Sequence, residues 1–309
     1  MEAVVFGNVT LDVICRTVDE VPRYDSVTFD QVIISPGGCG SNVAIGLSAL
    51  GVPTALVCRL AQDEASFLIE RFLKKAGIDF RYINRDSDTT SAVSVGLVDS
   101  NAQPRFIHTP GANTGLTVDD LKIDQLIRDG ARALHIAGFF VLPGLMDGRL
   151  PETLKIAKSQ GLLTTLDVVN SFRIKNPITL WPCLPHLDIF LCNQVEGVSL
   201  TGEKEPGLIA TKLRERGARA VIVKMGADGC LLEYNDYSDV IPAPIVENVI
   251  DTTGAGDAFA SGLIASLLRG NDLETACMDG NQAGAHMVTT LGAVGAWFQD
   301  NLFPSIGHI

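Results

Sequence analysis

The residues with the greatest capacity for chemistry lie in one short stretch, DTTGAGDAF at 251–259. Apolar residues recur at helical spacing over 258–269, so this stretch predicts the start of a helix. At a helix start several backbone N–H groups lack intrahelical partners, and the helix dipole favours negative charge. Gly254 and Gly256 carry no side chain that would keep a ligand from those amides. The stretch is typical of an anion-binding turn.

Asp257 is the unexpected member of this turn, because a carboxylate repels a bound phosphate. It suits a general base that takes a proton from an attacking hydroxyl while the neighbouring amides stabilise charge on the transferred group. A helix cap with a turn is the structural alternative, since Asp, Thr and Gly are all common there. The stretch by itself leaves both interpretations open.

A second glycine-rich stretch, SPGGCGSNVAIGLSALG at 35–51, also leaves backbone groups unshielded by side chains just before a helical run. It has no Lys-Ser/Thr pair of a P-loop and does not follow the dinucleotide-binding pattern G-x-G-x-x-G. Asn42 offers both a donor and an acceptor, which suits a neutral ligand rich in hydroxyl groups. This stretch favours a binding loop without identifying its ligand.

A sheet buried on both faces must position these two stretches. The candidate strands are short apolar runs with near-continuous Val, Ile and Leu, as expected when helices cover both faces. They lie at 3–9, 54–60, 132–140, 162–169, 187–193 and 219–226. Amphipathic stretches lie between them, such as 63–77, which opens on acids and ends on Lys-Lys-Ala-Gly in agreement with the helix dipole. The alternation predicts a doubly wound α/β fold with a mostly parallel sheet.

Two regions interrupt this alternation. Residues 11–35 and 91–109 have the pattern of hairpin strands with polar connections and no helix between them. We expect a small β-sheet lid over a cleft; the alternative is that these strands extend an edge of the main sheet. No linker divides the 309 residues, so we expect a single domain over 1–309. Because exposed lid faces often pair with a copy, we also expect a homodimer.

The amino-acid composition limits the classes of binding partner and the cellular compartment that we expect for this chain. The formal net charge of -12 argues against binding to nucleic acid or to an anionic membrane, because both need a cationic protein surface. No apolar run is long enough to span a bilayer, and the N-terminal MEAVVFGNV lacks the pattern of a signal peptide. The seven cysteines include no C-x-x-C pair, which excludes a zinc ribbon and argues against a disulfide framework. We therefore expect a soluble protein of the cytoplasm.

Taken together, the two glycine-rich stretches resemble motifs of the ribokinase-like (PfkB-type) carbohydrate kinase family. The motifs are Gly-Gly-x-Gly-x-Asn at 37–42 and Asp-Thr-x-Gly-Ala-Gly-Asp at 251–257. Intermediate landmarks extend the resemblance over nearly the whole chain: GNVTLD at 7–12, GAN at 111–113, N-x-x-E at 193–196 and KMGADG at 224–229. The resemblance implies a three-layer α/β/α fold with a small β-sheet lid. It also implies ATP-dependent phosphorylation of a hydroxyl on a sugar or sugar-like substrate.

The resemblance further implies roles for individual residues. Asp257 matches the catalytic base, and the anion hole that faces the γ-phosphate is matched by Gly254, Ala255 and Gly256. The positions that hold the sugar are matched by Asn8, Asp12, Gly37, Gly38 and Asn42. The nucleotide positions are matched by Asn193, Lys224, Gly226, Gly229 and Asn281. Glu196 matches a residue that organises Mg²⁺ through water, and Asp251 and Thr253 match a site for a monovalent cation such as K⁺.

Four positions keep a second interpretation or depart from the family. Lys224 stands where ribokinases often carry Thr, and it could contact phosphate or only line the nucleotide loop. Asn193 directly follows a candidate strand and could simply cap the next helix. Arg105, in the expected lid, is a candidate for binding an acidic or phosphorylated substrate, or else a solvated surface residue. Cys39 stands where ribokinases proper carry Lys, so the resemblance does not imply ribose as the acceptor.

Two other functions stay open at this stage. A nucleoside kinase of the same fold would phosphorylate a ribosyl group, and Phe106, Phe139 and Phe140 could then stack a base or could belong to the core. A non-catalytic sugar or nucleotide sensor is the second, although it would have no use for a base at Asp257.

Overall fold

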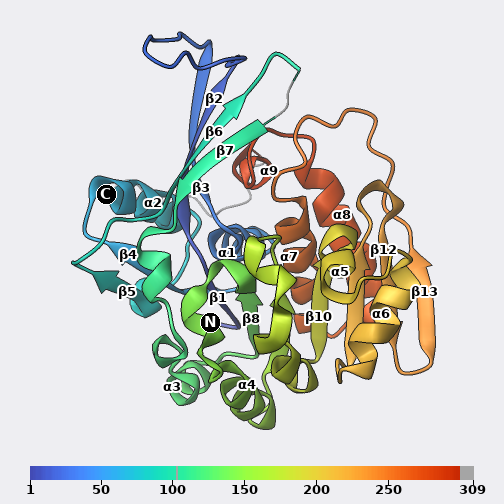
Figure 1. Cartoon of the computed structure of the whole chain (residues 1–309). Coiled ribbons are helices and arrows are strands. Elements are labelled where there is room, and N and C mark those ends of the chain that lie inside the picture. Colours follow the sequence, from blue (N-terminus) through green and yellow to red (C-terminus); the bar gives the residue numbers. More distant parts are fainter. Residues whose placement is uncertain (102–103, 300–309) are drawn as a thin grey trace.

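The computed structural model describes residues 1–101 and 104–299, which build one large sheet with helices on both faces and a smaller sheet above it (Figure 1). The large sheet has the strand order β13-β12-β11-β10-β9-β8-β1-β4-β5. Its strands pair in parallel from β5 to β11, and β12 and β13 are added antiparallel. The strands are β1 (Ala3–Gly7), β4 (Thr54–Ala61), β5 (Ile83–Asp86), β8 (Ala133–Ala137), β9 (Leu163–Asp167), β10 (Ile189–Asn193), β11 (Ala220–Lys224), β12 (Cys230–Tyr234) and β13 (Tyr237–Ile241).

Helices cover this sheet in two layers, because successive strand side chains point to opposite faces. On one face, Val4 and Phe6 of β1 belong to a core that also contains residues of the helices α3 (Ile123–Arg128), α4 (Leu150–Ser159), α5 (Gln194–Thr201) and α6 (Pro206–Glu215). On the other face, Val5 belongs to a core that also contains residues of α1 (Cys39–Ala49), α2 (Glu64–Lys75), α7 (Ala255–Leu268), α8 (Leu273–Met287) and α9 (Gly295–Gln299). Both faces of β1 are therefore buried, as its continuous apolar sequence predicts. Among the described residues, no helix combines the length and apolarity needed to cross a membrane.

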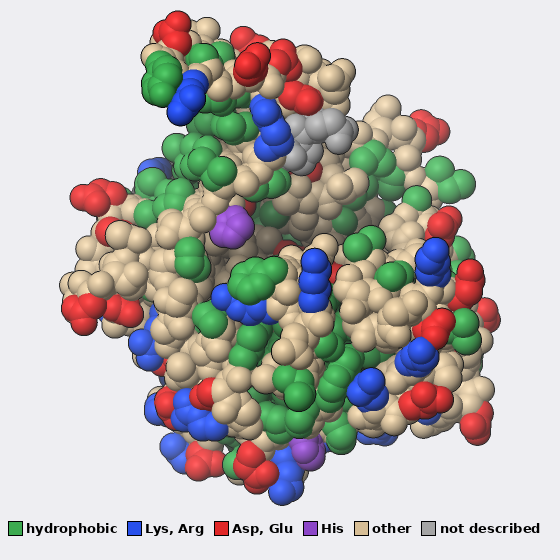
Figure 2. All heavy atoms as spheres, in the orientation of Figure 1, with side chains coloured by type: hydrophobic (Ala, Val, Ile, Leu, Met, Phe, Trp, Pro, Cys, Tyr) green, Lys and Arg blue, Asp and Glu red, His purple; other side chains and the backbone are tan. Residues whose placement is uncertain are grey.

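The smaller sheet, called the lid below, has the strand order β3-β2-β6-β7. Its strands are β2 (Thr10–Arg16), β3 (Gln31–Gly37), β6 (Val93–Val98) and β7 (Pro104–Thr109). They come from the two regions that interrupt the alternation of strands and helices, and they form a separate sheet rather than an edge of the large one. Figure 1 shows the lid standing above the body, and in Figure 2 the surface is hollowed beneath it.

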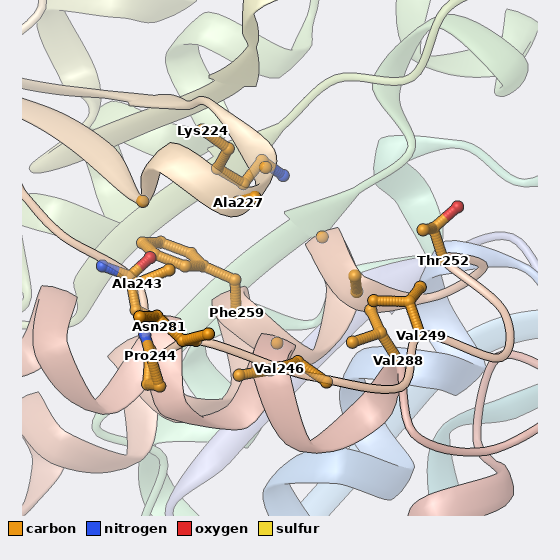
Figure 3. A pocket seen from close by; sticks show the side chains of 17 residues that line it. Lys224, Ala227, Ala243, Pro244, Val246, Val249, Thr252, Phe259, Asn281 and Val288 are labelled. Carbon is orange, nitrogen blue, oxygen red and sulfur yellow. The ribbon is translucent and has the colours of Figure 1, made fainter.

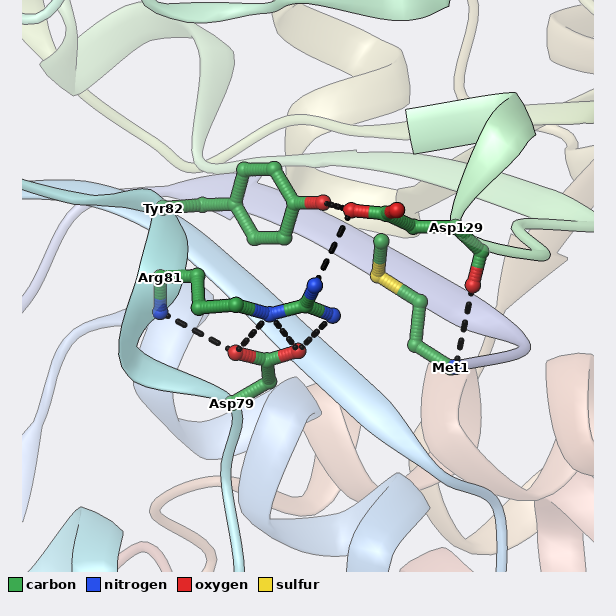
Figure 4. Close-up of polar contacts among 5 residues, drawn as sticks. All are labelled: Met1, Asp79, Arg81, Tyr82 and Asp129. Carbon is green, nitrogen blue, oxygen red and sulfur yellow. Dashed lines mark hydrogen bonds and ion pairs between the residues drawn. The ribbon is translucent and has the colours of Figure 1, made fainter. Parts of the chain in front are cut away.

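A cluster of polar contacts holds the opposite, amino-terminal edge of the sheet together (Figure 4). The Arg81 guanidinium bonds to Asp79 and, through Nη1, to Oδ2 of Asp129 at 3.1 Å. The Tyr82 hydroxyl donates to the same Asp129 carboxylate, and the N-terminal amine of Met1 donates to the Asp129 carbonyl at 3.3 Å. These contacts join the start of β1, the entry to β5 and the end of α3, far from the glycine-rich stretches, so they stabilise the body rather than a site.

Candidate active site

Several predicted site residues stand at the carboxyl ends of neighbouring strands. Asn8 follows β1, Asn193 ends β10 and Lys224 ends β11. Asp167, which the sequence analysis did not single out, ends β9 in the same way. The carboxyl ends of parallel strands meet at one edge of the sheet, where open α/β folds bind ligands. The topology therefore gathers these side chains beneath the lid.

The start of α7 adopts the geometry of an anion-binding turn. Gly254 is its N-cap residue with φ +79°, a left-handed conformation that favours glycine. A Cβ at Gly254 would also collide with the backbone of Ala293. The first amides of α7 have no carbonyl within the helix to bond, so this end attracts an anion. A plain helix cap was the structural alternative for this stretch. No side-chain hydrogen bond caps α7, so the structure does not support that alternative.

Asp257 lies in the first turn of α7 and joins the two glycine-rich motifs. Its Oδ2 accepts a hydrogen bond of 2.8 Å from Nδ2 of Asn42 on α1, and the Cys39 thiol also bonds to it. Burial raises the pKa of Asp257 above its ordinary value, while the Asn42 amide and the nearby Lys224 ammonium oppose that rise. A carboxylate whose pKa is raised in this way is more basic than a free aspartate, which suits a general base.

The predicted sugar-binding residues cluster around the start of α1. Gly38 is its N-cap residue with φ +88°, and a Cβ there would come within 2.7 Å of the Asn8 carbonyl oxygen. A Cβ at Gly37 would collide with the carboxylate of Asp12, which therefore lies directly against the glycine turn. Asp12 also accepts a hydrogen bond of 2.7 Å from the Thr10 hydroxyl, and burial raises the pKa of its carboxyl. The glycines thus allow Asn8 and Asp12 to reach the cleft.

Two buried amide oxygens in this cluster have no hydrogen-bond partner in the described part of the chain: Oδ1 of Asn8 and Oδ1 of Asn42. An unpaired buried acceptor is destabilising by roughly 1–3 kcal/mol, so native structures rarely contain one without a reason. Both residues adjoin the motifs that meet at Asp257. A ligand with several hydroxyl groups would donate to these oxygens.

Lys224 places a positive charge above the anion-binding turn. Its Nζ lies 2.6 Å from Oδ2 of Asp167. A Cβ added to Gly256 would be only 3.1 Å from the same Nζ. Burial raises the pKa of Asp167, and the Lys224 ammonium opposes the rise. The ammonium is therefore held beside the amides at the start of α7, where it can bind a phosphoryl group. A residue larger than glycine at 256 would push it away.

A cavity of about 370 Å³ extends from Lys224 over the first turn of α7 and the C-terminal half of α8 (Figure 3). It has the size and the mainly apolar walls of a site for a flat base. Gly226 and Gly229 line it on one side; Gly229 has φ +90°, and a Cβ there would collide with the Ile241 carbonyl oxygen. Asn281 lies at one end of the cavity beside Phe259, and its Nδ2 donates to the Ile241 carbonyl at 2.9 Å. Five residues were predicted to bind the nucleotide, and all of them except Asn193 line this one cavity.

Asn193 and Glu196 form a reciprocal capping box at the start of α5. Asn193 Oδ1 accepts from the Glu196 amide at 2.8 Å, and Glu196 Oε2 accepts from the Asn193 amide at 2.7 Å. The Glu196 carboxylate also accepts from the amide of Asn170. With these bonds made, Glu196 fits a magnesium ion through water better than as a direct ligand. Among the described residues no group of three or more His, Cys, Asp and Glu side chains is arranged to hold a metal ion.

Asp251 fixes the loop that leads into α7. Its Oδ1 accepts from the Thr253 amide at 2.9 Å and from the Thr253 hydroxyl at 2.6 Å, and its Oδ2 accepts from the Gly292 amide at 2.9 Å. One carboxylate oxygen therefore holds the loop itself, and the other ties it to the segment that follows α8. The monovalent cation expected beside Asp251 and Thr253 stays a prediction.

The structure does not bring Arg105 to the site. Its guanidinium donates to the carbonyl oxygens of Val18 at 2.6 Å and Asp19 at 3.1 Å within the lid. It is paired with Leu97 in the sheet and lies on the lid face opposite to that of its neighbour Phe106. The interpretation of Arg105 as a substrate ligand is corrected on this geometry. The strand register decides which face of the lid each of these side chains lies on, and sequence spacing alone did not supply that register.

Among the three candidate aromatic residues, only Phe106 faces a cavity. Phe139 and Phe140 are completely buried in the core and contact each other edge to face at 5.1 Å between ring centroids. The sequence analysis missed two residues of the site: Asp167, the buried partner of Lys224, and Arg16, which lines the cavity beneath the lid. The signal for Asp167 was available, because it is a charged residue inside the otherwise uncharged strand predicted at 162–169.

Comparison with known proteins places this arrangement in a family. The model for pfkB family carbohydrate kinases matches residues 2–298. The chain is 29% identical to the aminoimidazole riboside kinase of Salmonella typhimurium, over 93% of this chain and 91% of that protein. It is 27% identical to fructokinase-1 of Zea mays, over 90% of each. Relatives with different acceptors in their names therefore match this chain about equally.

The solved structures confirm the fold. The ribokinase of Arabidopsis thaliana, complexed with ribose and ATP, matches with a TM-score of 0.83 at 24% identity, over 95% of this chain and 94% of that one. The predicted fold class, a large mostly parallel sheet between helices with a small separate sheet, is the fold of that protein.

Proposed function

We propose that this chain, which belongs to the pfkB family of carbohydrate kinases, transfers the γ-phosphate of ATP to a hydroxyl of a sugar-like substrate with Asp257 as general base. The observation that carries the assignment is the bond between Asn42 and Asp257. It places a basic carboxylate beside the anion-binding turn and next to two unpaired amide oxygens. A group that accepts a proton, a site for an anion and a site for hydroxyls are what this reaction requires.

In the proposed reaction the acceptor oxygen attacks the γ-phosphorus while its proton passes to Asp257. The bond between the γ-phosphorus and the bridging oxygen breaks, and ADP leaves. The amides at the start of α7 and the Lys224 ammonium stabilise the negative charge on the phosphoryl oxygens. Phosphoryl transfer needs little covalent chemistry from the protein, so positioning and electrostatics supply most of the rate.

The nucleotide would bind with its base in the cavity lined by Gly226, Gly229 and Asn281 and its phosphates toward Lys224. Mg²⁺ accompanying ATP would neutralise charge on the phosphates, and Glu196 would hold it through water. A monovalent cation such as K⁺ would bind the loop of Asp251 and Thr253 and stiffen the approach to α7. The lid would close over the acceptor and exclude water, limiting hydrolysis of ATP.

We also propose a homodimer in the cytoplasm. The outer face of the lid is apolar: Val13, Cys15, Val32, Ile34, Val95, Leu97 and Ile107 share it by register. Ile34 on one edge strand of the lid is 46% exposed and Ile107 on the other is 67% exposed in the single chain, which leaves large aliphatic side chains uncovered across this sheet face. All seven cysteines are free thiols, in agreement with a reducing compartment.

The experiment is an ADP-release assay with ATP, Mg²⁺ and K⁺ across a panel of sugars, sugar acids and nucleosides, on the wild type and Asp257→Asn. We expect turnover to fall by about 10² or more in the variant, the usual scale for loss of a general base. Near-normal turnover would show that Asp257 is not the base. Ligand binding without ADP release in the wild type would favour the sensor instead.

A further inference from the structure

The inner face of the lid arranges its side chains in three levels above the cleft. Residues two apart on a strand share a face, and the strand register aligns them across the lid. The first level, nearest the glycine turn, is polar: Asp12, Ser35, Ser94 and His108. The second is apolar: Ile14, Ile33, Gly96 and Phe106. The third contains Arg16, Gln31 and Val98.

A cavity of about 300 Å³ separates this face from the body of the protein. From the lid, residues of all three levels line it, among them Asp12, Phe106 and Arg16. The opposite wall is formed by residues 249–253 and 291–293. Residues 249–253 lead into α7, and residues 291–293 lie beside its start, since Gly254 packs against Ala293. The cavity therefore borders the turn at the start of α7, where the phosphoryl group would be transferred.

The second level forms a flat apolar surface. A Cβ at Gly96 would come within 2.7 Å of both Ile14 Cδ1 and Phe106 Cε1, so these two side chains close over the glycine. Phe106 is nevertheless 45% exposed, and Ile250 on the opposite wall is 56% exposed. Large apolar side chains that remain exposed on both walls of one cavity indicate a ligand that covers them.

The distance between levels limits what that ligand can be. Two residues of a strand span about 6.8 Å, so one level is separated from the next by roughly that length. A single sugar ring whose hydroxyls bond at Asp12 fills the first level and leaves Phe106 and Ile250 uncovered. A longer sugar would place further hydroxyl groups on the apolar second level, where they would find no hydrogen-bond partner. The second level therefore disfavours a longer sugar.

The charges around the cavity argue against an anionic acceptor. Asp12 and Asp251 both line it, and Arg16 is the one cation among its described lining residues. A sugar acid or sugar phosphate would bring further negative charge between these carboxylates. Arg16, at the outer level, suits hydrogen bonds to the polar edge of a neutral group.

We propose that the acceptor is a riboside: a ribosyl group at the polar level with a flat, neutral heteroaromatic ring between Phe106 and Ile250. The ring's polar edge reaches Arg16. This inference rests on the proposed kinase activity and specifies its substrate class. The transferred group and the base are unchanged: the ribosyl hydroxyl loses its proton to Asp257 and gains the γ-phosphoryl group of ATP.

The first test compares acceptors by ADP release, using inosine and adenosine against ribose, fructose and gluconate. We expect kcat/KM for the better nucleoside to exceed that for each of the three other acceptors at least tenfold. A higher value for a free sugar or for gluconate overturns the riboside inference but leaves the kinase assignment intact. Calorimetry of inosine binding separates the riboside inference from the kinase assignment. Inosine binding without turnover would support the riboside site and remove the kinase assignment. Neither binding nor turnover with any acceptor overturns both.

The second test asks whether Phe106 contacts the ring. In Phe106→Ala we expect the Kd for inosine to rise at least tenfold, because base–aromatic stacking is lost, while the Kd for ADP is unchanged. Phe67→Ala is the matched control: Phe67 lies on α2, is 68% exposed and lines neither the lid cavity nor the nucleotide cavity. An unchanged Kd for inosine in a folded Phe106→Ala protein overturns the placement of the ring.

Discussion

Nδ2 of Asn42 donates a hydrogen bond of 2.8 Å to Oδ2 of Asp257, across 215 positions of the sequence. The bond joins the starts of α1 and α7, which are the two glycine-rich motifs. It fixes the carboxylate in orientation and also lowers its basicity, because a donated hydrogen bond favours the charged form. Asn42 thus links the sugar-binding cluster to the proposed base, and this link can be measured.

Asn42→Ala should change the pH dependence of the reaction. Activity requires Asp257 ionised, so kcat/KM rises as the pH rises through the Asp257 pKa. Burial already raises that pKa and the Asn42 amide lowers it. Removing the amide therefore moves the acidic limb of the kcat/KM profile to higher pH. The measurement is a pH–rate profile of ADP release, and an unmoved limb would mean that Asn42 does not act on the base.

Gly254→Ala should abolish most activity by spoiling the anion-binding turn. The residue has φ +79°, and a Cβ would meet the backbone of Ala293. Moving this turn misplaces the amides, and loss of such donors lowers kcat by about 10² or more.

Gly270→Ala is the control at the other end of α7. Gly270 also has a positive φ of +92°, but a Cβ there meets nothing within 4 Å. We expect it to lower the melting temperature slightly and leave kcat unchanged. If both variants lost activity equally, general strain in α7 and not the turn would be responsible.

Lys224→Met should damage catalysis and stability for separable reasons. The ammonium lies 2.6 Å from Asp167 and next to Gly256, so its loss removes a phosphate-binding charge and leaves a buried carboxylate unpaired. Breaking a buried pair on one side destabilises by about 3–5 kcal/mol.

The double variant Lys224→Met/Asp167→Asn separates these effects. We expect denaturant unfolding to show much of the stability restored, because no unpaired charge remains at this position. The KM for ATP and kcat should stay impaired, since the cation is still missing. Full recovery of activity would mean that Lys224 serves only to neutralise Asp167.

Ile107→Lys should convert the proposed dimer to a monomer. Ile107 is exposed on the outer face of the lid, and a charge there would be buried without a partner in a dimer. Light scattering after size-exclusion chromatography measures the mass. Val240→Lys, a similarly exposed position on the edge strand β13, is the control and should leave the mass unchanged. A monomeric wild type would contradict the lid dimer.

Local patterns in the sequence predicted the two glycine-rich turns and the strands β1, β4, β8, β9, β10 and β11 of the large sheet, but not β5, β12 and β13. Continuous apolar runs identify strands buried on both faces, and a glycine before a helical run identifies a bare helix start, because both signals depend on neighbouring residues only. Asp257 could be singled out for the same reason, since its misfit in an anion-binding turn is visible within seven residues.

The tertiary structure alone decided which side chains meet. Arg105 and Phe106 are adjacent in the sequence, yet only Phe106 lines the cleft, because the pairing of β6 with β7 sets the face of each. Phe139 and Phe140 look equally suited to a ligand and are core residues. The contact of Lys224 with Asp167 depends on β9 and β11 flanking β10. Strand order and register arise from packing across the whole chain, and so no local pattern contains them.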